Sequence, residues 1–183
     1  MPRYIALLRG INVTGNAMIR MEELRGIFEA LGFSGVATYI NSGNVGFDCR
    51  SPRVSNGVTP SLKLEEKIEA AVENHMGRPV AVVVRERSHI EGILANNPFD
   101  GEFESHKEMH VLFMKQEVSR EQLEMLRDAA PAEERFVAKG GEIYLHLPMG
   151  VAQSLMGRGL IEKKLKIAVT ARNWRTVQKL ASL

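Results

Sequence analysis

Cysteine, aromatic residues and long apolar runs are all scarce in this sequence of 183 residues. The single cysteine, Cys49, excludes an intrachain disulfide, and we expect it to be an incidental thiol in a reducing cytoplasm. The longest apolar runs, 5–8 and 80–84, are far shorter than the roughly 18 residues that a membrane span needs. We also expect no secretory leader, because no apolar stretch of sufficient length precedes Arg9.

The overall composition is that of an ordinary globular protein, with 44% apolar and 25% charged residues. The 24 basic and 22 acidic side chains give a net charge of +2, but they are unevenly placed. Residues 135–183 hold nine basic and two acidic side chains, whereas residues 89–134 hold four and eleven. The basic quarter is a candidate surface for anions or nucleic acid. We prefer the simpler interpretation, a solvated face that complements the acidic middle segment.

Hydrophobic periodicity predicts the element order βαββαβ in the first half of the chain. An apolar stripe from Met21 to Leu31 is typical of an amphipathic helix, and Ser42-Gly43 is expected to form a tight hairpin turn. The expected strands are 4–8, 36–40, 45–47 and 80–84, and the second helix covers 64–76.

The second half repeats this order after a connector helix, which a capping box at Ser88 should open. A second capping box at Ser119 predicts another helix, Gly140-Gly141 predicts a hairpin turn, and Asn173 should cap a terminal helix. The expected strands are 109–114, 134–138, 143–147 and 167–170, with a short helix over 160–165. We therefore predict an α+β fold, a tandem pair of ferredoxin-like (βαββαβ) units with an added C-terminal helix. The expected boundaries are 1–88, a connector over 89–107, and 108–183.

This topology predicts that two polar segments meet at one end of the first sheet. In a split βαβ unit the loop after the first strand and the hairpin turn share that end, which brings 9–16 close to 41–44. Arginine offers a bidentate fork, asparagine donates and accepts, and glycine permits close backbone approach, so an anionic or planar polar ligand is suited. Asparagine and glycine are equally what turns require, and both interpretations stay open. Arg9 is the best functional candidate, because turns do not need arginine.

Other motifs in the sequence do not support a defined chemistry. Gly10 and Gly15 have the spacing of a phosphate-binding P-loop, but Asn16-Ala17 stands where that motif has Lys and Ser or Thr. The segment 157–162 lacks the third glycine of a dinucleotide fingerprint, and the pattern His-x-Glu-x-His over 106–110 lacks the context of a metal site. We therefore expect no metal and no tightly bound cofactor. Each hairpin also carries too few aromatics for an RNA-stacking sheet.

Four short motifs spread along the chain resemble a known bacterial family. They are Leu7-Leu8-Arg9-Gly10-Ile11-Asn12, Asn41-Ser42-Gly43-Asn44-Val45, Asn97-Pro98-Phe99 and Thr170-Ala171-Arg172-Asn173-Trp174. Together they resemble the family catalogued as domain of unknown function 1697. The resemblance implies a compact α+β protein of two ferredoxin-like halves, and it implies no activity, ligand or partner. Relatives are commonly basic just after the glycine-rich turn, whereas Asn16-Ala17-Met18 follows Gly15 here, which weakens a phosphate grip by this loop.

The leading hypothesis is a cytoplasmic binding module for a small anion, a nucleotide or a nucleic-acid backbone. An enzyme is the first alternative, a transferase or hydrolase that acts on a phosphorylated small molecule with Arg9 stabilising developing charge. The second alternative is a self-associating scaffold, because the continuous apolar strands 80–84 and 111–114 must be covered on both faces, either by the other half of the chain or by a second copy. The candidate ligand-binding residues are Arg9, Asn12, Asn41, Ser42, Asn44, Arg172 and Asn173.

Overall fold

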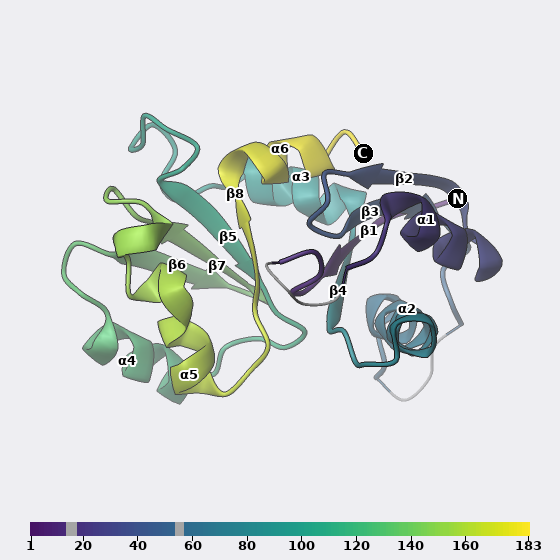
Figure 1. Ribbon diagram of the computed structural model, residues 1–183. Coiled ribbons are helices and arrows are strands. Elements are labelled where there is room, and N and C mark those ends of the chain that lie inside the picture. Colours follow the sequence, from purple (N-terminus) through teal and green to yellow (C-terminus); the bar gives the residue numbers. More distant parts are fainter. Residues whose placement is uncertain (14–17, 54–56) are drawn as a thin grey trace. The chain divides into compact units, whose positions relative to one another are not determined.

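The computed structural model shows an α+β protein whose chain divides into two compact units (Figure 1). It describes residues 1–13, 18–53 and 57–183. The first unit comprises 1–92 together with 179–183, and the second comprises 93–178. No helix within the described ranges is both long enough and apolar enough to cross a bilayer.

The first unit is built on a four-stranded antiparallel sheet with the strand order β2-β3-β1-β4. Thr59 caps α2 by accepting a hydrogen bond from the Leu62 amide at 3.2 Å, and Gly77 ends that helix in the left-handed region with φ +69°. The elements are β1 (Arg3–Leu8), α1 (Met21–Ala30), β2 (Ser34–Tyr39), β3 (Asn44–Asp48), α2 (Pro60–Met76), β4 (Val82–Glu86) and the start of α3 (Arg87–Ala95).

One face of this sheet packs against α1 and α2 in a single apolar core. Tyr4, Ala6 and Leu8 alternate along β1 and are fully buried in it with Phe28 of α1 and Phe47 of β3. The rings of Phe28 and Phe47 meet edge to face with centroids 5.3 Å apart. The period-2 pattern of the strand and the 3.6-residue stripe of the helix thus bury the same cluster.

The other face of the sheet is buried as well. Ile5 and Leu7 point away from that core and are fully buried, as is Val83 at 2% exposure. This burial of both faces agrees with the continuous apolar strands of the sequence.

The second unit has a sheet of the corresponding order, β6-β7-β5-β8, again antiparallel throughout. The predicted capping box at Ser119 is present: its Oγ accepts from the Gln122 amide at 3.2 Å, and Gln122 Oε1 accepts from the Ser119 amide at 2.9 Å. The elements are β5 (Met109–Phe113), α4 (Arg120–Ala129), β6 (Arg135–Lys139), β7 (Glu142–His146), the turns η1 (Val151–Gln153) and η2 (Met156–Leu160), α5 (Ile161–Leu165), β8 (Thr170–Asn173) and α6 (Trp174–Leu180).

Two local predictions are wrong. Ser88 does not cap the connector helix, because α3 begins at Arg87 directly after β4 and the Ser88 hydroxyl instead lies 3.4 Å from Glu86 Oε2. The last strand is Thr170–Asn173 rather than 167–170, because the backbone of 170–173 pairs with β5 while Val169 contributes its side chain to the core. The apolar content of 167–170 therefore indicates that these residues are buried, but it does not indicate which residues pair with a strand.

Candidate functional site

The loop after β1 and the β2–β3 hairpin turn lie in contact, as the topology predicts. The Leu8 amide donates to the Gly43 carbonyl at 2.8 Å, and Asn12 Nδ2 donates to the Asn41 carbonyl at 2.9 Å. Gly43 is required by this approach, since a Cβ there would lie 2.8 Å from side-chain atoms of both Leu8 and Ile11, and its φ is +76°. The part of the predicted segment that covers residues 14–16 lies outside the described residues.

The side chains of two of the predicted asparagines form hydrogen bonds that hold these segments together. Asn12 adopts φ +54°, and its amide also donates to the Ile19 carbonyl at 2.9 Å and accepts from the Ile19 amide at 2.8 Å. Asn44 is fully buried and donates to the Tyr39 carbonyl and to Ser42 Oγ, both at 3.0 Å. These side chains therefore build the site, while those of Arg9 and Asn41 are exposed beside it.

A second arginine, which no sequence motif marks, lies against this loop. Arg78 follows the glycine that ends α2, and its Nη2 lies 3.4 Å from the Gly10 carbonyl. Its Nε is buried and has no hydrogen-bond partner among the described residues. The Arg9 amide donates to the Ala81 carbonyl at 2.9 Å, which ties the loop to the start of β4. A lone arginine after a helix end carries no motif, so only the fold reveals it.

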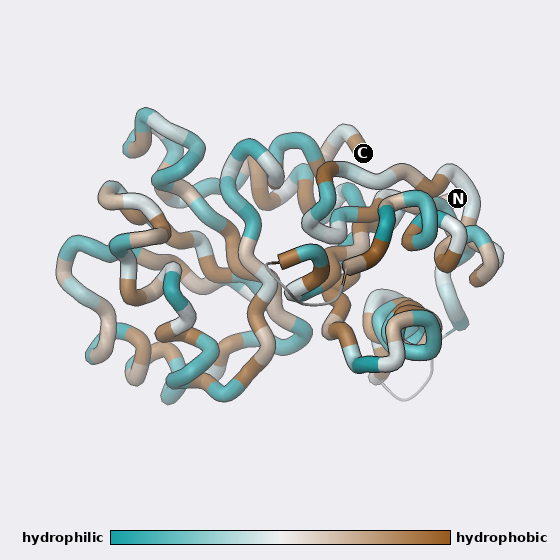
Figure 2. Tube along the Cα trace, viewed as in Figure 1, coloured by the Kyte–Doolittle hydropathy of each residue, from teal (hydrophilic) through white to brown (hydrophobic). Residues whose placement is uncertain are grey.

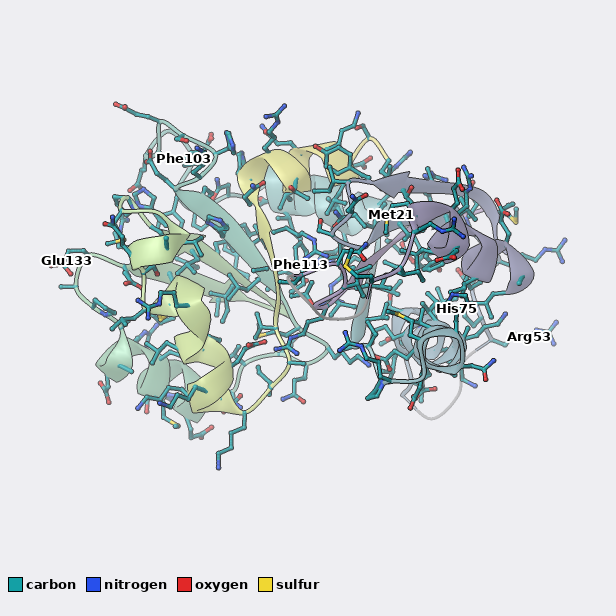
Figure 3. The ribbon with its side chains drawn as sticks, in the orientation of Figure 1. Met21, Arg53, His75, Phe103, Phe113 and Glu133 are labelled. Atoms are coloured by element: carbon teal, nitrogen blue, oxygen red, sulfur yellow. The ribbon has the colours of Figure 1, made fainter. Side chains whose placement is uncertain are left out.

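An open hollow of about 490 Å³ lies next to the loop. It is lined by Asn12, Met18, Ile19, Arg20, Met21, Glu22, Glu23 and Asn41 (Met21 is labelled in Figure 3). Glu23 closes one side, where its carboxylate accepts from Arg20 Nη2 at 2.8 Å and from the Arg20 amide at 3.1 Å. These hydrogen bonds lower the pKa of Glu23 and raise that of Arg20, so both groups are charged at neutral pH.

The remaining predicted residues, Arg172 and Asn173, belong to β8 in the second unit. Asn173 Oδ1 accepts from the Thr176 amide at 2.9 Å and thereby caps α6, as its sequence position predicts. Arg172 Nη1 donates to the Ala171 carbonyl at 2.9 Å, and burial lowers the pKa of Arg172 to about 10, which leaves it protonated at neutral pH. That these two residues share a site with Arg9 stays a prediction.

The described ranges contain no group of three or more His, Cys, Asp or Glu side chains placed to hold a metal ion. His110 of the His-x-Glu-x-His pattern is a buried core residue, and burial lowers its pKa to about 4. Cys49 is also buried, and burial raises the pKa of its thiol. A protonated, enclosed thiol is a poor nucleophile, which agrees with the expectation of an incidental cysteine.

Comparison with known proteins identifies the family of this chain. The family model described as "Protein of unknown function (DUF1697)" matches residues 1–144. The chain belongs to this family. Among solved structures it is similar to the conserved bacterial protein SP0830 from Streptococcus pneumoniae, with a TM-score of 0.68 and 24% identity over 99% of this chain and 97% of that one. This similarity supports the fold alone, and no curated protein matches the sequence.

Proposed function

We propose that the first unit is a binding module for a phosphate-bearing ligand, which is held at Arg9 and Arg78. The observation that carries this proposal is the approach of Arg78, from the segment after α2, to the Gly10 carbonyl of the loop that carries Arg9, with an Arg78 Nε that has no hydrogen-bond partner among the described residues. Gly10 has φ +66°, and open space surrounds the position that a Cβ would take, so a ligand oxygen can approach its backbone.

A phosphate group fits this arrangement better than a carboxylate does, because a phosphate group has the higher charge. Guanidinium forks bind phosphate oxygens bidentately, and two of them, one on the loop and one against it, would balance the double charge of a phosphate group. The ligand classes that share this group are a small inorganic anion, a nucleotide and a nucleic-acid backbone. Asn12 and Asn44 serve the site indirectly, because their amides fix the loop and the turn.

We also propose a common origin for the two units and a cytoplasmic location for the protein. We infer that the two units are ferredoxin-like and descend from a tandem duplication, and their corresponding strand orders support this inference. A cytoplasmic location is likewise part of the proposal, supported by a single buried cysteine whose thiol is free.

The first prediction concerns Arg9. Titration calorimetry with inorganic pyrophosphate should show binding to the native protein and a loss of roughly tenfold or more in affinity for Arg9→Ala, the cost of a charge-assisted contact. The melting temperature should change little, because Arg9 is exposed.

The matched control is Arg25→Ala, which removes an exposed arginine of α1 and should leave pyrophosphate affinity unchanged. Unaltered binding by Arg9→Ala together with a large fall in melting temperature would assign Arg9 a structural role instead.

A further inference from the structure

The hollow beside the arginine loop, residues 9–12, offers contacts that a phosphate group alone would not use. Its wall is largely apolar, formed by Met18, Ile19 and Met21, and its volume of about 490 Å³ lies within the roughly 300–1,000 Å³ of small-molecule sites. Met18 is 75% exposed. Figure 2 shows that the chain is hydrophobic on both sides of the grey segment 14–17, and Met18 and Ile19 follow that segment directly in sequence. Flexible thioethers and an apolar wall suit a flat, weakly polar ring.

Two polar side chains of the hollow remain available to recognise such a ring. Asn41 is exposed, and its side-chain amide makes no hydrogen bond within the described ranges. Glu22 is exposed as well, and unlike Glu23 it is not paired with Arg20. A carboxylate accepts hydrogen bonds only, whereas an amide donates and accepts. The base that complements this pair presents two adjacent N–H donors beside a carbonyl, as guanine does.

The hollow and the arginine loop are close enough for one ligand to reach both. Asn12 lines the hollow and follows Arg9 by three residues, a stretch of chain that spans at most roughly 10 Å. Resting on the proposed phosphate site, we propose that the hollow takes the base of a guanine nucleotide, with its ring against Met18 and Met21 and its donors on Glu22. The phosphates then lie at Arg9 and Arg78.

Calorimetry with GDP and with pyrophosphate tests this inference on the full chain. We expect GDP to bind at least tenfold more tightly than pyrophosphate. Glu22→Gln and Asn41→Ala should each lower GDP affinity roughly three- to tenfold, the usual effect of one hydrogen bond, and leave pyrophosphate affinity unchanged. Glu29→Gln, another exposed carboxylate of α1, is the control and should change neither.

Each failure has its own meaning. Equal affinity for GDP and pyrophosphate, or ADP binding as tightly as GDP, would overturn the guanine assignment and leave the phosphate proposal standing. If neither pyrophosphate nor GDP binds, the phosphate site itself is refuted, and the base site with it.

Discussion

At the scale of single residues, side chains of the same type serve different purposes in this protein. Asn44 is fully buried, and its amide donates hydrogen bonds to the Tyr39 carbonyl and the Ser42 hydroxyl. Asn41, three positions earlier, is exposed. Both were candidates for ligand contact on sequence grounds, because turns and binding loops favour the same residue. Burial is what separates them.

Asn44→Ala should therefore destabilise the fold. Removal of the amide leaves two half-buried acceptors without their donor, and we expect a loss of about 1–3 kcal/mol in the free energy of unfolding, measured with chemical denaturant. Asn41→Ala serves as the comparison and should stay within about 0.5 kcal/mol of the native protein. If Asn44→Ala matched Asn41→Ala in stability, Asn44 would not hold the turn.

His110 should make the stability of the protein depend on pH. Burial, together with the charge of His106, lowers the pKa of His110 to about 4, while in the unfolded chain it is about 6.5. Above pH 6.5 the imidazole is neutral in both states. As pH falls from 6.5 toward 4, the unfolded chain takes up a proton that the folded protein does not, so stability is lost.

The measurement is the free energy of unfolding at pH 7 and pH 5 for the native protein and for His110→Gln. Between these two values His110 should account for about 2 kcal/mol of the loss, which the variant does not show. His89→Gln removes an exposed histidine and should retain the native dependence. Identical pH profiles for the native protein and His110→Gln would show that His110 titrates normally in the folded state.

At the scale of elements, residues 179–183 belong to the first unit, and Leu183 packs against its sheet. Gly46 in β3 faces away from the Phe28–Phe47 core, and a Cβ there would lie 3.0 Å from the Leu183 carbonyl carbon and 3.1 Å from its Cγ. Arg3 Nε also donates to the Leu183 carbonyl oxygen, and its Nη1 pairs with Asp48 at 3.0 Å. The glycine thus leaves room for Leu183.

Gly46→Val should lower the free energy of unfolding by about 1–3 kcal/mol through this overlap. In a chain that lacks residues 181–183 the same substitution should cost little, because valine favours a strand once the overlap is gone. Denaturant titration of the four proteins measures the coupling. An equal cost of Gly46→Val in both backgrounds would mean that Leu183 does not pack there.

The sequence predicted the elements of this fold well wherever periodicity and capping agree. The Ser119 capping box and the Gly140-Gly141 turn are present because their signals are local. The last strand was displaced by several residues, since pairing with β5 depends on the partner strand and not on the apolar content of 167–170. Arg78 was missed for the same reason, because its approach to Gly10 spans 68 positions of the sequence.

At the scale of the whole molecule, net charge and the proposed site point to different parts of the chain. The excess of basic residues lies within 135–183, most of which belongs to the second unit. The proposed phosphate site uses only two arginines of the first unit, but Arg9 is on the loop and Arg78 lies against it, where the backbone of Gly10 is accessible. Placement, rather than the number of charges, decides which surface binds specifically.

Amide chemical shifts of the full-length protein, recorded during titration with inorganic pyrophosphate, test this most directly. We predict saturable shifts that centre on residues 8–12, 41–44 and 77–81 of the first unit. Shifts confined to the basic residues between 158 and 178 would contradict the account and assign anion binding to the second unit.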